Sequence, residues 1–266
     1  MAKIFYFTGT GNCYSVANRL GKMLNADLVA VMQYLDNPSE IEDEVIGIVT
    51  PVYSTDLPPI MVEFLEKLQV NGAKYIFCVA TMGALAGRTL YHAKEILQKR
   101  KIILNAGFTV TLPDNSIIFP SGIIRTHKLL EAEVESVNAI GSLIENRKEN
   151  SAVLKDFFFW KIAAAIGMWV LRSVLDVNHK KLNENKCNGC GICAKICQAG
   201  CIRLENGRPS FSDEGCLTCF GCAQWCPREA ITLGYLHPMG KTKYVHPDVT
   251  VQDIAGRSAW QIKLEK

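Results

Sequence analysis

The chain has 266 residues, which is enough for one large domain and a small one. Its composition, 48% hydrophobic and 21% charged, is that of a globular protein able to bury a sizeable core. A formal net charge of +3 excludes the strongly basic surface of a typical nucleic-acid-binding protein. The N-terminus has one lysine and a short apolar stretch before a glycine loop, so we expect no signal peptide and a cytoplasmic location.

Short apolar runs alternate with amphipathic stretches over residues 1–115. Strands are expected near residues 3–7, 27–31, 45–50, 75–81 and 102–111, and helices over 12–25, from 58 onward and over 87–100. Such alternation predicts an α/β fold, a doubly wound five-stranded parallel sheet with helices on both faces. Ligands of these sheets bind at the carboxyl ends of the strands, so the loops that follow the strands are the candidate site.

The first of these loops, residues 8–13, reads Thr-Gly-Thr-Gly-Asn-Cys. A P-loop needs a lysine after its last glycine, and none is present. A dinucleotide-binding loop needs a third glycine where Tyr14 stands, and an acidic residue about twenty positions later, where residues 31–33 are Val-Met-Gln. The sequence does satisfy a third arrangement, in which hydroxyl groups and backbone N–H groups at a helix N-terminus hold a phosphate monoester.

This loop resembles the phosphate loop of the flavodoxin family, Thr/Ser-x-Thr-Gly-Asn-Thr/Ser, with Cys13 in place of the last hydroxyl residue. The resemblance implies a flavodoxin-like fold that binds FMN, and the missing hydroxyl implies weaker FMN binding. Loop 50–59 resembles the family's loop that packs an aromatic side chain on the isoalloxazine ring. Tyr53 is the candidate for that role, although it also fits an ordinary loop tyrosine.

Two further loops fall at the same edge of the expected sheet. Residues 81–87 are mostly small and would let backbone amides approach a flat ring, and residues 113–115 are similarly placed. The resemblance therefore implies a set of FMN-binding residues, with none assigned a catalytic role. They are Thr8, Gly9, Thr10, Gly11, Asn12, Cys13, Pro51, Val52, Tyr53, Ser54, Thr81, Met82, Gly83, Ala84, Gly87 and Asn115.

A helical segment follows the candidate FMN-binding domain, which we place at residues 1–150. Residues 123–148 fit an amphipathic helix, and residues 157–171 form an apolar run interrupted by Lys161 within an apolar and basic linker, 151–182. The run is shorter than the roughly 18 residues that span a bilayer. We expect a helix clamped between domains or in a homodimer interface, or else an amphipathic helix lying on a membrane surface. The tail, residues 234–266, has no ligand pattern and fits a strap packed on the core.

Eight cysteines follow one repeated pattern. Residues 187–197 and 216–226 both read C-x2-C-x2-C-x3-C, and the second unit repeats the first at a period of 29 residues. This is the spacing of iron–sulfur ligands, in which glycines such as Gly189, Gly191 and Gly221 relax the backbone around the sulfides. Zinc is the alternative metal for CxxC pairs, but four evenly phased cysteines, duplicated, fit two cubane clusters better.

Residues 183–233 resemble the bacterial two-cluster ferredoxin family. The resemblance implies a small α+β domain with two 4Fe–4S clusters, each of which takes its fourth cysteine from the other motif. The implied ligands are Cys187, Cys190, Cys193 and Cys226 for cluster 1, and Cys216, Cys219, Cys222 and Cys197 for cluster 2. The first motif ends in Gln198 where the family has proline, so we expect a looser loop there. Cys78 and Cys201 fit small buried side chains.

The whole chain resembles a flavodoxin–ferredoxin fusion family common in anaerobic bacteria. We expect an oxidoreductase or electron carrier that passes electrons between the clusters and FMN and couples one-electron and two-electron carriers. A reductase of a small organic acceptor, fed through the clusters, is one alternative, and an iron–sulfur redox sensor is another. Redox proteins are the expected partners, and nucleic acid is not.

Overall fold

Five parallel strands form the central sheet of the protein. The structure is a computed structural model that describes residues 1–150, 158–237 and 243–255. The strands are β1 (Ala2–Tyr6), β2 (Ala26–Ala30), β4 (Val45–Pro51), β6 (Tyr75–Met82) and β7 (Ala106–Thr111). Their order, β2-β1-β4-β6-β7, is the flavodoxin-like order 2-1-3-4-5 once two short strands, β3 (Glu40–Ile41) and β5 (Gln69–Val70), are set aside. The expected fold class is confirmed.

The last strand begins later than the sequence suggests. Residue Lys101 has a positive φ of 61°, and the N–H of Ile102 donates to the carbonyl of Leu97. These contacts end the preceding helix in a turn. The apolar residues from 102 therefore belong to the connection, and pairing with β6 starts only at Ala106.

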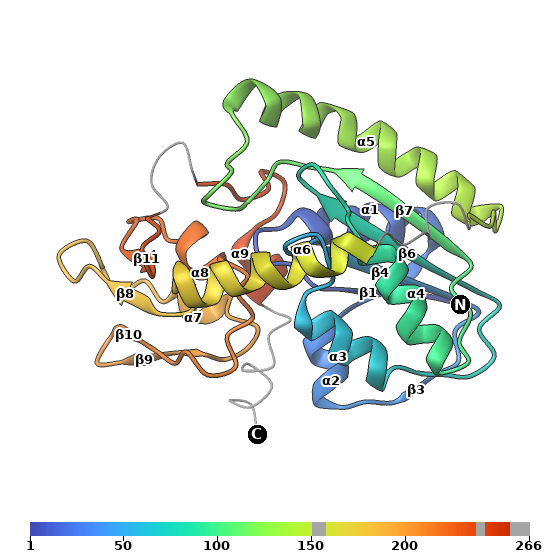
Figure 1. Ribbon diagram of the computed structural model, residues 1–266, viewed down its shortest axis with the longest axis horizontal. Coiled ribbons are helices and arrows are strands. Elements are labelled where there is room, and N and C mark those ends of the chain that lie inside the picture. The colour runs from blue at the N-terminus through green and yellow to red at the C-terminus, as the bar shows by residue number, and fades with distance from the viewer. Residues whose placement is uncertain (151–157, 238–242, 256–266) are drawn as a thin grey trace.

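Helices cover both faces of the sheet (Figure 1). One face carries α1 (Asn12–Leu24) and α5 (Ile123–Glu145), and the other carries α2 (Val31–Asp36), α3 (Pro59–Lys67) and α4 (Thr89–Lys99). Successive side chains of a strand point to opposite faces, so Ile4 and Tyr6 belong to the core under α1 and α5, whereas Phe5 and Phe7 belong to the other core. The short helix α2 has no counterpart in the elements expected from the sequence.

The C-terminal part is a small unit of short helices and antiparallel strand pairs. Its elements are β8 (Lys180–Leu182), α7 (Ile192–Lys195), β9 (Ile202–Glu205), β10 (Arg208–Phe211), α8 (Gly221–Gln224) and β11 (Ile231–Leu233). Strand β8 pairs with β11, and β9 pairs with β10. The pairing starts at Lys180, ahead of the expected boundary at 183. Buried residues of this unit, such as Ile196 and Ile231, belong to the same core as α1 and α5.

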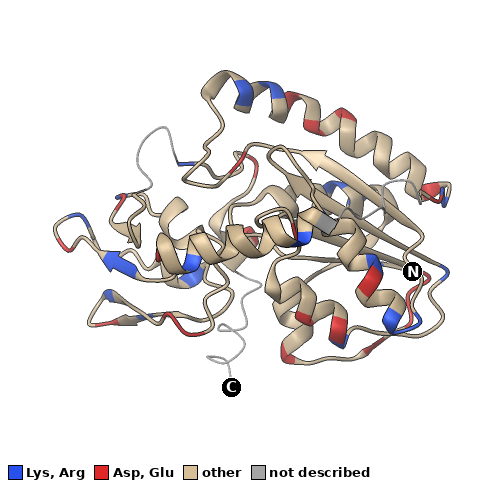
Figure 2. Ribbon diagram, in the orientation of Figure 1, with Lys and Arg blue, Asp and Glu red and all other residues tan. Residues whose placement is uncertain are grey.

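A long apolar helix lies across both parts. Helix α6 (Phe158–Trp169) continues into a π-helical turn, η1 (Val170–Val174), and crosses in front of the sheet toward the C-terminal unit (Figure 1). Figure 2 shows little charge along it. Within the described part of the chain, no helix has the length and apolarity needed to cross a membrane. An outer stripe of α6 that includes Ile162 and Ile166 is exposed, and its expected contact with a second copy or a membrane surface stays a prediction.

The tail packs against the first loop of the sheet. The N–H of His246 donates to the carbonyl of Thr10 at 2.8 Å, and the helix α9 (Val251–Ala255) follows. The side chains of His246 and Glu133 are 1% and 3% exposed, and His246 Nε2 lies 2.7 Å from the Glu133 carboxylate. Because His246 Nδ1 accepts from the N–H of Asp248, Nε2 carries the proton and donates. Burial raises the pKa of Glu133, but the hydrogen bonds from His246 and Ser15, together with nearby positive charge such as that of Arg19, leave this pKa below its ordinary value.

We predict that His246→Ala destabilises the protein, because it removes a donor from a buried carboxylate. Losing one hydrogen bond to a buried group costs about 1–3 kcal/mol. The measurement is thermal unfolding under anaerobic conditions. His237→Ala is the matched control, since His237 is exposed on the same tail. Equal melting temperatures for the two variants would contradict a role for the pair in holding the tail.

Candidate functional site

The loop between β1 and α1 forms a small polar cradle. Thr8, Gly9, Thr10, Asn12 and Cys13 line a cavity of about 60 Å³ at the N-terminus of α1. The cradle is held rigidly from within, since Thr8 Oγ1 accepts from the N–H of Gly11 at 3.0 Å. The Sγ of Cys13 lies 3.1 Å from Thr81 Oγ1, and burial raises its pKa to about 12, so this thiol stays neutral. Neutral donors at a helix N-terminus suit an anionic group.

The loop after β4 is a tight hairpin that projects toward this cradle. Tyr53 and Asp56 exchange two backbone hydrogen bonds of 2.9 and 3.0 Å, and the two residues between them, Ser54 and Thr55, have φ of 46° and 67°. Positive φ at both central positions is the type I′ turn, which normally takes asparagine and glycine. Ser54 and Thr55 therefore hold strained backbone, a feature that concentrates at functional sites.

Contacts from α4 hold the hairpin in this conformation. The carboxylate of Asp56 accepts from Arg88 at 3.1 Å and lies 2.8 Å from His92 Nδ1. Gly87 packs directly against the hairpin, because a Cβ on it would lie 2.0 Å from the carbonyl oxygen of Thr55. Glycine at position 87 thus allows the hairpin to pack closely, and Gly87 lines neither the cradle nor the larger cavity beside it.

A second, larger cavity adjoins the cradle. It measures about 540 Å³, in the range of ligand pockets, and shares Val52, Tyr53, Gly83, Asp114 and Asn115 with the cradle. The remaining wall is mostly apolar and is formed by Ser54, Thr55, Ala84, Leu85, Ser116, Ile118, Phe119, Gly167, Met168, Val170, Leu171, Leu175, Thr218, Cys219 and Phe220. Gly167 of α6 lies against Ser54, so α6 and η1 roof the cavity. Thr55 Oγ1 is buried with no hydrogen-bond partner among the described residues.

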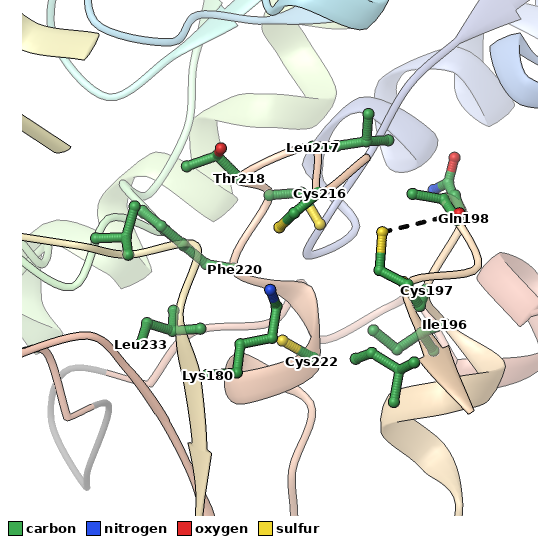
Figure 3. A pocket seen from close by; sticks show the side chains of 15 residues that line it. Lys180, Ile196, Cys197, Gln198, Cys216, Leu217, Thr218, Phe220, Cys222 and Leu233 are labelled. Carbon is green, nitrogen blue, oxygen red and sulfur yellow. Dashed lines mark hydrogen bonds between the residues drawn. The ribbon is translucent and has the colours of Figure 1, made fainter. Parts of the chain in front are cut away.

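The eight motif cysteines surround two separate cavities, and each set combines both motifs. Cys187, Cys190, Cys193 and Cys226 line one cavity. Cys197, Cys216, Cys219 and Cys222 line the other, shown in Figure 3. The structure thus brings together the two sets that the crossed arrangement requires. In the described part of the chain, no three His, Cys, Asp or Glu side chains converge on a single ion position.

Both cysteine loops depend on residues with positive φ at matching positions of the repeat. The first motif uses glycines, Gly189 and Gly191, each with φ of 73°. The second motif uses Thr218 and Phe220, with φ of 55° and 60°. The expectation that Gly221 relaxes the second loop is wrong, since Gly221 starts α8 and its small size serves another contact. A Cβ on Gly221 would lie 2.9 Å from the carbonyl oxygen of Gly9.

The second cysteine loop packs directly on the β1–α1 loop. A Cβ on Gly9 would lie 2.4 Å from the carbonyl oxygen of Cys219, and Trp225 Nε1 donates to the carbonyl of Gly9 at 3.0 Å. Gln198 is 5% exposed and donates to the carbonyl of Thr8 at 2.6 Å. Gln198 therefore anchors its loop to the sheet domain, and the looser loop expected from the missing proline is not what forms.

Comparison with known proteins gives one family match and several similar solved structures. Residues 180–203 match the family described as 4Fe-4S binding domain. No curated protein matches the chain. Among solved structures, the chain is similar to a two-electron reduced flavodoxin from Megasphaera elsdenii, at 14% identity and a TM-score of 0.35, over 53% of this chain and 98% of that one. It is also similar to a WrbA-like flavodoxin from Agrobacterium tumefaciens, at 15% identity and a TM-score of 0.34, over 55% of this chain and 98% of that one.

The chain joins a flavodoxin-like sheet to a 4Fe–4S ferredoxin-like unit. The fusion expected from the sequence is thereby shown. Of the residues implied to bind FMN, Gly11 and Gly87 line neither cavity of the flavodoxin-like part, and Gly11 instead packs against His246. All the others line at least one of the two cavities.

Several residues that line the two cavities are not among the residues expected from the sequence. Thr55, Asp114 and Leu85 lie beside residues that the loop pattern does indicate, and could be found from it. Phe119 and the η1 residues carry no motif, and only the folded chain brings them to the flavodoxin-like loops. Cys201 also stands in the second cysteine cavity, but its Sγ donates to the carbonyl of Glu214 at 3.3 Å, so it behaves as a buried thiol with a backbone partner.

We predict that Gly87→Ala displaces the Tyr53–Asp56 hairpin and weakens flavin binding. The new Cβ meets the Thr55 carbonyl, and alanine at φ of 55° is itself unfavourable by about 1–2 kcal/mol. Gly72→Ala is the matched control, because Gly72 also has a positive φ, of 75°, but no atom within 4 Å of the added Cβ. FMN titration and thermal unfolding measure the two effects. Unchanged FMN affinity in Gly87→Ala would show that the hairpin does not contribute to the flavin site.

Proposed function

We propose that the protein is an electron-transfer flavo-iron–sulfur protein in which two 4Fe–4S clusters exchange electrons with FMN. When bound, FMN accepts one or two electrons and each cluster carries one, so the chain would couple one-electron and two-electron carriers. Support comes from three sites described above: the two cavities lined by four motif cysteines each, and the cradle with its adjoining large cavity.

The residues present fit the two clusters. Each cysteine cavity has four thiols from two motifs, which is the crossed ligation of two-cluster ferredoxins. Backbone segments with positive φ at Gly189, Gly191, Thr218 and Phe220 turn the loops around these cavities. Cys187, Cys190, Cys193 and Cys226 would hold cluster 1, and Cys216, Cys219, Cys222 and Cys197 would hold cluster 2.

The residues present also fit FMN. The cradle at the N-terminus of α1 would bind the phosphate through Thr8, Thr10 and backbone N–H groups. The larger cavity, between the Tyr53 hairpin and the loop at Gly83, would take the isoalloxazine ring.

One observation carries the proposal: Cys219 and Phe220 line both the second cysteine cavity and the large flavodoxin-like cavity. A cluster held by Cys219 and a ring in the large cavity would be separated by a single layer of protein. Electron transfer weakens steeply with distance, so this shared wall favours cluster 2 as the neighbour of the flavin. Cys190 of the other set is exposed, which favours cluster 1 as the place where redox partner proteins deliver or collect electrons.

The test is anaerobic analysis of the wild-type protein beside two cysteine variants. The wild type should contain about eight irons per chain and one FMN. Cys226→Ser should lose the EPR signal of the cluster held by Cys187, Cys190 and Cys193 and slow the reduction of FMN by an external one-electron donor. Cys201→Ala, the control, should keep both clusters, because, among the described residues, Cys201 is the one cysteine lining the second cysteine cavity that lies outside the two motifs.

Zinc, or about two irons per chain, in the wild type would contradict the cluster assignment. Retention of cluster 1 in Cys226→Ser, with loss of the cluster of its own motif, would contradict the crossed ligation. FMN reduction at the wild-type rate without cluster 1 would contradict its place on the electron path.

A second candidate function is reduction of a small organic acceptor at the flavin. The observation that favours it is the apolar roof over the large cavity, made by Gly167, Met168 and Leu171 of α6 and η1 with Phe119. Such a roof excludes water and would suit a flat apolar acceptor such as a quinone or an enoate.

We predict that if the roof serves an acceptor, the reduced protein converts one such compound with saturation kinetics. A panel of quinones, enoates and tetrapyrroles tests this under anaerobic conditions, with product identified by chromatography. Leu171→Trp should raise KM by filling the cavity while leaving both clusters intact. Absence of saturable turnover across the panel would leave electron carriage as the function of the site.

A further inference from the structure

The cavity assigned to cluster 2 contains a buried positive charge. Lys180 of β8 lines it and is 8% exposed. Its Nζ donates to the carbonyl of Asn178 at 2.7 Å, which fixes the side chain. Figure 3 shows the ammonium group directed into the cavity toward Cys216 and Cys222. Among the described residues that line this cavity, Lys180 is the only Lys, Arg, Asp or Glu.

The antiparallel pair β8–β11 extends beneath both cysteine cavities. Leu182 and Ile231 face the cavity assigned to cluster 1, and Leu233 faces the one assigned to cluster 2. Side chains two residues apart on a strand share a face, so Lys180 occupies a position equivalent to these three apolar residues. A lysine in an otherwise apolar row loses its hydration when buried, which an alkyl side chain would avoid. The burial of a lysine at this position therefore indicates that its positive charge has a function.

Among the described residues that line the other cysteine cavity, no lysine or arginine is buried; Lys243 Nζ donates to the carbonyl of Cys226 at 2.6 Å but does not line the cavity. Arg228 lines it, but its side chain is exposed and donates to the carbonyl of Lys186 at the surface. Water and salt screen an exposed charge far more than a buried one. The buried positive charge that lines a cysteine cavity therefore belongs to the cavity next to the flavodoxin-like part.

We propose that Lys180 raises the reduction potential of cluster 2 above that of cluster 1 and so directs electrons toward the flavin side. A nearby positive charge stabilises the reduced cluster, which carries one more negative charge than the oxidised cluster. One electron passing from reduced cluster 1 to oxidised cluster 2 then moves downhill, with no proton or bond change. Lys180 would act on the cluster only through the electric field of its charge, without binding the cluster. This inference rests on the proposed function.

The experiment is an EPR-monitored redox titration of the full-length protein with both clusters loaded. Wild type should show two distinct midpoint potentials. In Lys180→Met and Lys180→Gln the higher potential should fall toward the lower one, and the lower should stay in place. Lys180→Arg should keep most of the separation, because it keeps the charge. Lys181→Met is the matched control: it removes the same charge from the adjacent residue, which is exposed on the opposite side of the strand.

The midpoint potentials of these variants distinguish the role of Lys180 from the cluster assignment itself. Potentials in Lys180→Met and Lys180→Gln that match those of Lys181→Met would overturn the role of Lys180 while leaving the two-cluster assignment intact. Loss of cluster 2 from both neutral variants would make Lys180 an assembly residue and would equally overturn a role in setting the potential. A wild-type protein without two 4Fe–4S signals would overturn the proposed function itself, and with it the inference.

Discussion

The backbones of Gly9 and Cys219 are in direct contact, and the relation between the two parts of the protein depends on that contact. Any side chain on Gly9 would overlap the Cys219 carbonyl, and any side chain on Gly221 would press on the Gly9 carbonyl. Hydrogen bonds from Trp225 to Gly9 and from Gln198 to Thr8 hold the same loops together. Because these bonds use backbone carbonyls of the cradle, the cradle cannot shift without moving the second cysteine loop. The candidate flavin and cluster sites thus form one rigid arrangement.

The same contact explains why the two cysteine motifs differ although they repeat one pattern. The first motif satisfies its positive φ values with glycines. The second satisfies them with Thr218 and Phe220, at a cost in backbone strain. Both side chains serve the junction: Phe220 walls the large cavity, and Thr218 Oγ1 donates to Asn178 Oδ1 at 2.9 Å. Glycine would relieve the strain but leave the wall open, so the second loop keeps bulky residues where it faces the flavodoxin-like part.

Much of this fold follows from the sequence, since its signals are local. Alternating strands and helices in residues 1–115 predict the five-stranded parallel sheet, and the resemblance to two-cluster ferredoxins implies the cysteine sets that line the two cavities. What escapes prediction depends on contacts between distant segments. Gly9 fits a phosphate loop, and only the structure shows that Cys219 also requires its small size. Gln198 is a departure from the family pattern, and its bond to Thr8 spans 190 positions. Lys180 is adjacent to Lys181 in the chain, and only the strand's alternation separates the buried charge from the exposed one.

The direction of electron flow, in this arrangement, is a property of position and charge together. The three proposed cofactor sites lie in a row. The cysteine set that includes exposed Cys190 is at one end, the cavity lined by Cys219 is in the middle, and the large cavity under α6 and η1 is at the other end. A linear arrangement still allows flow either way. The buried ammonium of Lys180 would favour transfer from cluster 1 to the middle site, because it would stabilise the reduced form of a cluster held there, where little water screens the charge. An electron on a cluster at the middle site would be separated from a flavin in the large cavity only by the wall that Cys219 and Phe220 form, so transfer onward to the flavin would cover the shorter distance.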